Sequence, residues 1–466
     1  MFEILDSTLR EGELFQAYDG QVKQKVASII CGLRPGRIEL TLDYPPRSDG
    51  AELESNLASI RESGVSAVLH GRACDEDVER ISSHHVEACG LYIAVSKLHR
   101  DYKLHGITEE EALDQLCRAV SNAKSKGIRY VRATLEDASR LYLEDGEAGL
   151  ARIASSTRRL RDAGATLVSV PDTSGLMTPR QARAFFRGLS EASALPLSAH
   201  FHNDYGFASA NTVEACLEGA AELQVSLMGI GDRNGIADMY EVVASLEDVH
   251  GLESGVNREG LRPAYEAFAK ATGLNTGWRH PLSAEAQTIR AGVHQSMTVR
   301  RPDGYIPMKK LEYDFGGPRY SANQFISHNL VRSLLSRFGP EMTGEESRLI
   351  ADRIAAAARD NRHVGPSKIR EIVVELTGVD IPRQEIASLF GGQEVYVLMK
   401  LRPQSPAARI AGEVANWSDV EAVDEVYGEL DMVVRARLRR GKENVVSDLK
   451  RDYSDHIVEM RVLLTE

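Results

Sequence analysis

The segment HFHND contains two histidines, His200 and His202, separated by one residue. Side chains two positions apart on a β-strand point to the same face, so both imidazoles could reach one metal ion if this segment is a strand. In isolation, such a pair is explained equally well by two packed or solvated histidines. A position at the end of a barrel strand, where functional groups gather, favours the metal site.

A second group of charged residues lies in the segment DSTLREGE, which contains Asp6, Arg10 and Glu11. One carboxylate beside two histidines gives a mixed oxygen and nitrogen site, which suits Zn, Mn, Mg or Co and leaves positions open for substrate oxygens. Arg10 would place a fixed positive charge next to that metal. The alternative is a charged turn that leads into a helix.

Eight short β-type runs alternate with longer helical patterns over about the first 250 residues, which is typical of parallel strands joined by crossover helices. We expect strands at residues 2–6, 37–41, 66–70, 91–95, 130–134, 166–170, 197–201 and 224–228. No glycine-rich phosphate loop follows the first strand. The pattern therefore favours a closed TIM (β/α)8 barrel over an open doubly wound sheet.

Polar side chains follow many of these predicted strands. Because every strand of such a barrel ends at the same face, residues far apart in the sequence converge there. Besides the residues named above, this group contains Arg72, Glu136, Asp137, Asp172, Thr173, Asn203, Asp204, Asp232, Arg233 and Asn234.

The chain turns helical after the eighth strand, with amphipathic stretches at residues 345–360 and 369–376. From residue 394 the predicted order is β, α, β, β, α, β, with the second helix near 443–450, which is the order of a ferredoxin-like sandwich. We predict a catalytic TIM barrel at 1–255, a helical extension at 256–390 and a ferredoxin-like α+β domain at 391–466.

Composition narrows the choice of partner and compartment. A net charge of −12 argues against nucleic acid, whose phosphates require concentrated Lys and Arg. The five cysteines form no CxxC pair, so neither a disulfide framework nor a cysteine zinc site is indicated, and a reducing compartment fits best. Without a signal-peptide pattern or an apolar run of the ~18 residues that span a bilayer, we expect a soluble cytoplasmic protein with no membrane partner.

Four ordered segments carry a family resemblance: DSTLREGE, VPDTSG followed by TPRQ, HFHNDYGFASAN and GIGDRNGI. Over residues 1–335 their order and spacing resemble the homocitrate and isopropylmalate synthases of the barrel metallolyase superfamily, and homocitrate synthase above all. The resemblance implies an acyltransferase that condenses acetyl-CoA with a metal-bound 2-oxo acid and then hydrolyses the thioester.

The resemblance also implies roles for individual residues. Glu11, His200 and His202 would bind the divalent metal, and Arg10 would stabilise the enolate oxygen formed from acetyl-CoA. Thr173 would bind the substrate carboxylate. Glu136, in the segment LEDASR, would belong to the acid and base apparatus. The segment SKLHRDYKL resembles the family's strand-four loop, with His99 and Lys103 as substrate or thioester contacts; the alternative is a solvated loop. Arg72 and Arg132 are the other predicted substrate contacts.

The segment RAGVHQS resembles the stretch that carries the family's catalytic histidine, here His294, and its companion is Tyr305. In relatives this pair reaches the active site of the neighbouring subunit, which implies a homodimer. A pKa near neutrality suits histidine for removing a methyl proton. The alternative is a loop histidine without a role.

Five positions depart from the homocitrate synthase pattern: Leu14, Cys74, Ser198, Asp232 and Ile289 replace Gln, His, Glu, Glu and His. The departures weaken the choice of 2-oxo acid more than the choice of reaction. 2-Oxoglutarate, which would give homocitrate for lysine biosynthesis, is our first choice. The alternatives are an isopropylmalate, citramalate, citrate or other alkylmalate synthase, an acyl-CoA lyase or aldolase, and a non-catalytic amino-acid sensor.

The segment VEAVDEVYGELDMVVRARL resembles the amino-acid-binding domain of Lrp/AsnC-type regulators, with Gly428, Glu429 and Asp431 in the ligand-adjacent turn. The resemblance implies allosteric inhibition by an amino acid, with lysine as one choice. The alternative is a domain that only dimerises.

Overall fold

The computed structural model forms two compact units, Met1–Thr272 and Gly273–Glu466. It describes residues 2–44, 50–274, 276–277, 279–283, 286–314, 318–338, 342–361, 364–382, 385–386, 390, 394–415, 417, 420–437 and 445–464. Among these, no helix is long and apolar enough to cross a membrane.

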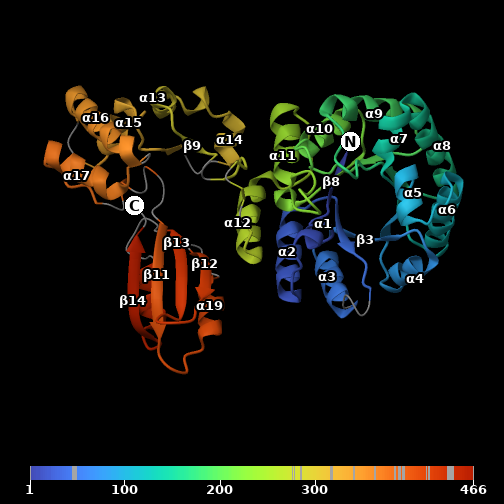
Figure 1. Ribbon diagram of the computed structural model, residues 1–466, viewed down its shortest axis with the longest axis horizontal. Coiled ribbons are helices and arrows are strands. Elements are labelled where there is room, and N and C mark those ends of the chain that lie inside the picture. Colours follow the sequence, from blue (N-terminus) through green and yellow to red (C-terminus); the bar gives the residue numbers. More distant parts are fainter. Residues whose placement is uncertain are drawn as a thin grey trace. The chain divides into compact units, whose positions relative to one another are not determined.

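The first unit is built around a closed barrel of eight parallel strands in sequential order (Figure 1). The strands are β1 (Glu3–Asp6), β2 (Arg37–Thr41), β3 (Ser66–Arg72), β4 (Ala88–Ala94), β5 (Tyr130–Glu136), β6 (Leu167–Ser169), β7 (Leu197–Ala199) and β8 (Glu222–Val225). β1 pairs with both β2 and β8, which closes the barrel. The predicted TIM barrel is confirmed.

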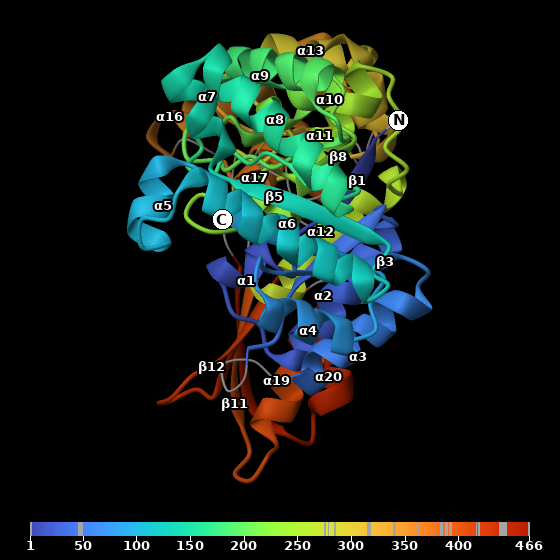
Figure 2. The same ribbon diagram turned by 90° about the vertical axis from the view of Figure 1, so that its right-hand side faces the viewer.

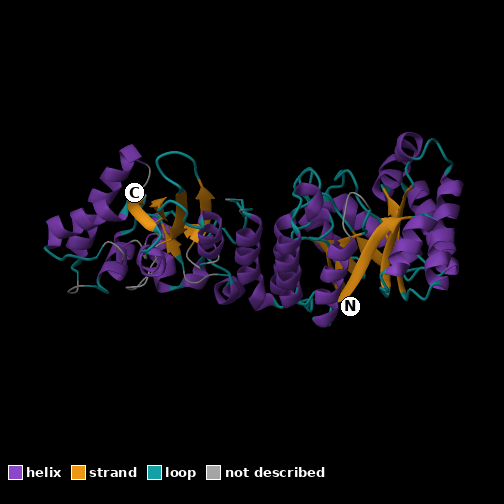
Figure 3. Cartoon of the chain, turned by 90° about the horizontal axis from the view of Figure 1, so that it is seen from below, coloured by secondary structure: helices purple, strands orange, loops and turns teal. Residues whose placement is uncertain are grey.

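Helices surround these strands (Figures 2 and 3). They are α1 (Glu11–Phe15), α2 (Gly20–Leu33), α3 (Gly50–Glu62), α4 (Asp75–Ser83), α5 (Lys97–Lys103), α6 (Glu109–Ser125), α7 (Ala138–Asp145), α8 (Glu147–Ala163), α9 (Pro179–Ala192), α10 (Ala208–Leu217), α11 (Met239–Ala244) and α12 (Leu261–Thr272). Local signals set their ends: Thr108 and Glu111 form a capping box before α6, and Gly164 ends α8 in the left-handed conformation.

Two strands differ from their predicted bounds in ways that matter for the site. β7 ends at Ala199 instead of residue 201, so His200 and His202 lie just beyond the strand. β8 ends at Val225 because the next residues form a 3-10 turn, in which Met228 has a φ of 57°. An apolar run alone does not reveal this turn.

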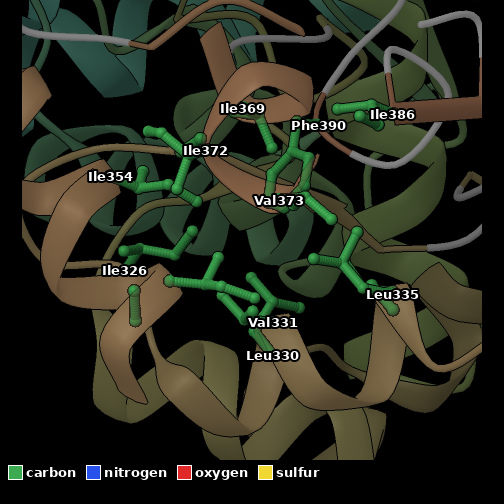
Figure 4. Close-up of a cluster of buried hydrophobic side chains, with 14 of the residues drawn as sticks. Ile326, Leu330, Val331, Leu335, Ile354, Ile369, Ile372, Val373, Ile386 and Phe390 are labelled. Atoms are coloured by element: carbon green, nitrogen blue, oxygen red, sulfur yellow. The ribbon is translucent and has the colours of Figure 1, made fainter. Parts of the chain in front are cut away.

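The helical part of the second unit has its own hydrophobic core (Figure 4). Leu330, Ile354 and Ile369 are fully buried in it, at 0% exposure. The elements are β9 (Thr288–Ile289), α13 (Gly292–Arg300), α14 (Met308–Tyr313), β10 (Arg319–Tyr320), α15 (His328–Leu335), α16 (Gly344–Asn361) and α17 (Pro366–Thr377). The two helices predicted at 345–360 and 369–376 correspond to α16 and α17.

The end of the chain forms an antiparallel sheet of order β12-β13-β11-β14, whose strands lie side by side in Figure 1. The elements are β11 (Glu394–Leu401), α19 (Ala407–Ala415), β12 (Val420–Glu425), β13 (Met432–Arg437), α20 (Val445–Tyr453) and β14 (Ile457–Leu464). This is the predicted βαββαβ order. Residues 443–444 of the predicted last helix, and the predicted domain start at 391, lie outside the described residues.

Candidate active site

Three buried side chains converge beyond the carboxyl ends of β1 and β7. Glu11 is the first residue of α1, while His200 and His202 follow β7. His200 Nε2 lies 3.3 Å from His202 Nε2 and 3.7 Å from Glu11 Oε1. One ligand atom from each of the three residues lies within 4.8 Å of the others. The predicted metal ligands therefore meet at one point.

This donor set fits a divalent metal. Metal bonds of ~2.0–2.2 Å at tetrahedral angles place neighbouring ligand atoms about 3.3 Å apart. Burial lowers the pKa of His200 well below its usual value and also lowers the pKa of His202. Lowered pKa values favour the neutral imidazoles that bind metals.

Backbone contacts between neighbouring loops position the two histidines. The Asp172 N–H donates to the His200 carbonyl at 2.9 Å, and the His202 N–H donates to the Asp172 carbonyl at 3.3 Å. His202 also forms an antiparallel bridge with Ile236. These contacts continue the side-by-side arrangement of the barrel past the last residue of β7, so the two imidazoles still reach the same point.

The loop after β8 holds the loops after β6 and β7. Arg233 donates to both carboxylate oxygens of Asp204 at 2.8 Å, and to the Thr173 carbonyl at 2.9 Å. Asn234 Nδ2 donates to the Asn203 carbonyl at 2.7 Å. These hydrogen bonds join the polar motifs that follow β6, β7 and β8 into one surface.

Arg10 contacts the metal-binding group directly. Its Nη1 contacts Glu11 Oε1, and its Nε donates to Glu39 Oε2 at 2.8 Å. Arg132, a predicted substrate contact, has 0% exposure and contacts Glu39 Oε1 and Glu222 Oε1, the latter at 3.3 Å. Its observed partners are protein carboxylates, and a substrate contact by Arg132 stays a prediction.

A second polar group surrounds Glu136 and Thr173. Lys103 Nζ donates to both Glu136 oxygens, at 2.6 and 2.8 Å. His99 Nδ1 lies 3.7 Å from Glu136, and His99 Nε2 lies 3.6 Å from Asp137. The Asp137 N–H donates to Thr173 Oγ1 at 2.9 Å. The structure therefore places His99, Glu136 and Thr173 in one group around Asp137, and their roles in binding and catalysis stay predictions.

Arg72 ends β3, and its guanidinium pairs with Asp77. The two hydrogen bonds from the Arg72 guanidinium to Asp77 are 2.7 and 3.0 Å long, yet 56% of the Arg72 side chain is exposed. The Tyr44 ring lies 5.3 Å from the guanidinium carbon. The structure shows where Arg72 lies, and its substrate role stays a prediction.

The predicted residues of the second unit lie in two places. His294 is on α13, and its ring stacks on that of Tyr305 with centroids 3.9 Å apart. Gly428 and Glu429 are exposed in the turn between β12 and β13. Asp431 Oδ2 instead accepts from the Leu401 N–H at 2.7 Å, so this carboxylate supports the sheet.

Glu39 and Glu222 were not among the site residues predicted from the sequence. Both are buried barrel carboxylates, and both pair with Arg132 of β5 although they lie on β2 and β8. Neither β2 nor β8 neighbours β5, so the three side chains can meet only inside the barrel. The available signal for Glu39 was its position between two apolar residues, Ile38 and Leu40, in the middle of a predicted strand.

Two of the departures from the homocitrate synthase pattern now have defined surroundings. Ser198 donates to Glu222 Oε1 at 2.7 Å and accepts from Gln224 at 2.9 Å, inside the barrel. A carboxylate on β8 thus contacts the position where homocitrate synthases carry a glutamate on β7. Leu14 is 63% exposed on α1, three residues after Glu11.

Sequence comparisons agree with this geometry. The chain is 27% identical over 455 residues to a homocitrate synthase of Saccharolobus islandicus, covering 94% of this chain and 93% of the relative. It is 33% identical over 309 residues to a probable 2-isopropylmalate synthase of Ignicoccus hospitalis, covering 66% of this chain and 75% of the relative.

Solved structures support the barrel fold. The hydroxymethylglutaryl-CoA lyase of Pseudomonas aeruginosa matches 61% of this chain and 96% of its own with a TM-score of 0.51 at 19% identity. The HMG-CoA lyase of Brucella melitensis matches 59% of this chain and 99% of its own with a TM-score of 0.50 at 21% identity. The HMGL-like family model matches residues 1–267. The chain therefore belongs to the HMGL-like family and is an enzyme of the acyltransferase class.

Proposed function

We propose that this enzyme condenses acetyl-CoA with a metal-bound 2-oxo acid and releases free CoA by hydrolysis of the thioester. The observation that carries the proposal is the convergence of Glu11, His200 and His202 beside the Arg10 guanidinium. A cation site next to a fixed positive charge suits a reaction in which two carbonyl oxygens gain negative charge.

The residues of the barrel have distinct roles in this reaction. Glu11, His200 and His202 would hold the metal, which when bound would supply Lewis acidity to the keto carbonyl of the acceptor. Arg10 stabilises the enolate oxygen of the acetyl group. Thr173 Oγ1 accepts from the Asp137 N–H, so its own proton is available to donate to the acceptor carboxylate.

A base must remove a methyl proton from the acetyl thioester before the carbon–carbon bond forms. We assign this step to His294 with its stacked partner Tyr305, contributed by the second subunit of a homodimer. The enolate carbon then adds to the keto carbon, and water cleaves the thioester. Glu136, paired with Lys103, belongs to the acid and base apparatus that returns protons to the product.

2-Oxoglutarate remains our first choice of acceptor, with homocitrate as the product, because the similarity to homocitrate synthase extends over 94% of the chain. Isopropylmalate, citramalate, citrate and other alkylmalate synthesis are the alternatives. The turn with Gly428 and Glu429 is our proposed site for an amino-acid effector. We also propose that the enzyme works in the cytoplasm.

The test is release of free thiol from acetyl-CoA across a panel of 2-oxo acids, with and without divalent metal. We expect metal-dependent release with one acceptor far above the others. Cleavage of a hydroxyacyl thioester without net thioester hydrolysis would instead identify a lyase. Amino-acid binding without thiol release from any acceptor would identify a sensor.

A further inference from the structure

Glu39 connects the Arg10 side chain to strand β2 of the barrel. The carboxylate lies in the middle of β2 with 0% exposure. Its Oε2 accepts from Ser7 Oγ at 2.7 Å and from Arg10 Nε at 2.8 Å. Its Oε1 contacts Arg132 Nη2 and lies 3.3 Å from His70 Nδ1. Four side chains therefore meet at this one carboxylate.

The surroundings keep this carboxylate charged. Burial alone would raise its pKa, but the Arg10 and Arg132 guanidinium groups hold the pKa of Glu39 well below its usual value. A buried anion of this kind persists only when cations and hydrogen-bond donors satisfy it. Glu39 thus stays ionised in contact with Arg10.

The contacts of Arg10 divide its guanidinium into separate parts. Nε donates to Glu39 and Nη1 contacts Glu11. Among the described residues, no hydrogen bond uses Nη2, and 14% of the side chain is exposed. Protein carboxylates therefore bind the Arg10 guanidinium at Nε and Nη1, while Nη2 is left to bind another acceptor.

We infer that Glu39 is a positioning residue, which holds the Arg10 guanidinium in place for the enolate oxygen and keeps it from pairing fully with the metal ligand Glu11. This inference rests on the proposed function, because it assigns Arg10 to the enolate. Without the Glu39 charge, Glu11 is the one carboxylate among the described residues that Arg10 still contacts. Arg10 would then compete with the metal for Glu11.

Glu222 provides a matched control. It is also a buried barrel carboxylate, and it pairs with Arg132 at 3.3 Å. Its other described partners are Ser198 at 2.7 Å, Tyr130 at 2.5 Å and Arg37 at 3.9 Å. Glu39→Gln and Glu222→Gln each neutralise one partner of Arg132, but only Glu39→Gln neutralises a partner of Arg10.

The experiment compares the full-length wild type with Glu39→Gln, Glu39→Asp and Glu222→Gln. It measures kcat, the KM for acetyl-CoA, Mn²⁺ affinity by titration calorimetry, and the unfolding midpoint. For Glu39→Gln we expect kcat to fall by about 10²-fold, as when one oxyanion donor is lost, with KM changed by less than about threefold. Mn²⁺ affinity falls about 10-fold, the usual size for a residue behind a metal ligand.

Glu222→Gln lowers the unfolding midpoint but keeps kcat and Mn²⁺ affinity within about threefold of the wild type, because it leaves the groups around the metal in place. Glu39→Asp keeps the charge and gives an intermediate kcat, and it replaces Glu39→Gln in the comparison if that variant does not fold. Equal losses of kcat and Mn²⁺ affinity in the Glu39 and Glu222 variants would overturn the inference.

The Mn²⁺ titration separates this inference from the proposed function. If the wild type releases no thiol with any acceptor, the proposed reaction fails, but the titration still applies. Weaker Mn²⁺ binding in Glu39→Gln alone supports Glu39 as the residue that keeps Arg10 off Glu11. Unchanged Mn²⁺ binding in that variant rejects it.

Discussion

Charged residues lie both at the barrel mouth, by which we mean the carboxyl ends of the barrel strands, and in the turn between β12 and β13. The two regions differ in how deeply these residues are buried. Glu11 and His200 are only 2% and 4% exposed, and their neighbours come from distant parts of the chain. Glu429 is exposed, and Asp431 bonds to the backbone of Leu401. Buried charges depend on one another, whereas exposed charges interact mainly with water.

This difference predicts the size of mutational effects. Breaking a buried ion pair leaves an uncompensated charge and typically costs ~3–5 kcal/mol, whereas an exposed pair contributes ~0–1 kcal/mol. Substitutions at the barrel mouth should therefore change metal binding and catalysis strongly. Substitutions in the turn should change stability or effector binding weakly, and leave the chemistry alone.

Removal of a metal ligand gives the largest effect. We expect His202→Ala to abolish metal binding and thiol release, because two ligands cannot hold the cation as three do. Metal titration and the thiol assay measure both. The exposed His85 is the matched control, and His85→Ala should behave as wild type. Near-normal turnover in His202→Ala would remove the metal centre from the mechanism.

Replacement of Arg10 comes second. In Arg10→Gln we expect kcat to fall by about 10²–10³-fold while metal still binds, because the enolate oxygen loses its cation but the three ligands remain. Arg451→Gln, which removes an exposed guanidinium paired with Asp452, is the control and should leave kcat unchanged. Retention of wild-type kcat in Arg10→Gln would contradict the assignment of Arg10 to the enolate.

The sequence predicted the barrel because strand and helix patterns alternate strongly, and each end of a parallel strand opens onto the same face. That rule also predicted that the segment after the first strand would meet His200 and His202 across about 190 residues of chain, and the family resemblance selected Glu11 as its metal ligand. The structure brings the three side chains together. The same rule could not predict the residue at which β7 ends. The carbonyl of His200 and the amide of His202 are satisfied by Asp172, a contact between loops that no local pattern reveals.

The interior of the barrel explains the other limit of prediction. Arg132 was predicted as a substrate contact, but its side chain pairs with Glu39 and Glu222 from two other strands. Which inward-facing residues meet depends on strand register and tilt, and these are properties of the closed barrel. The sequence pattern of eight separate strands does not specify this register and tilt.

The next prediction concerns Asp6, a buried carboxyl whose pKa burial raises from 3.8 to about 7. Between these values the folded state binds more protons than the unfolded state, so the free energy of unfolding falls as the pH rises. Asp6→Asn removes this slope. At ~1.4 kcal/mol per pKa unit, its gain over the wild type should approach at most ~4 kcal/mol above pH 7 and vanish below pH ~4.

Denaturant unfolding of both proteins from pH 4 to pH 8 measures this gain. The comparison at pH 4 is its internal control, since there the carboxyl is protonated in the folded wild type and about half protonated in the unfolded wild type, so that little of the gain remains. A gain that is independent of pH would show that Asn packs better than Asp, and that proton binding at Asp6 does not limit stability.

The smallest effects belong to the turn between β12 and β13. Asp431→Ala leaves the Leu401 N–H without its carboxylate acceptor and should lower the free energy of unfolding by about 1 kcal/mol. Glu429→Ala removes an exposed carboxylate and should change stability by less than ~0.5 kcal/mol. Denaturant unfolding and amino-acid titration of both variants distinguish support of the sheet from ligand binding. If Glu429→Ala abolishes binding of every amino acid tested while stability is kept, the exposed side of the turn is a binding site. If only Asp431→Ala weakens binding, in proportion to its loss of stability, the turn affects binding only by supporting the sheet.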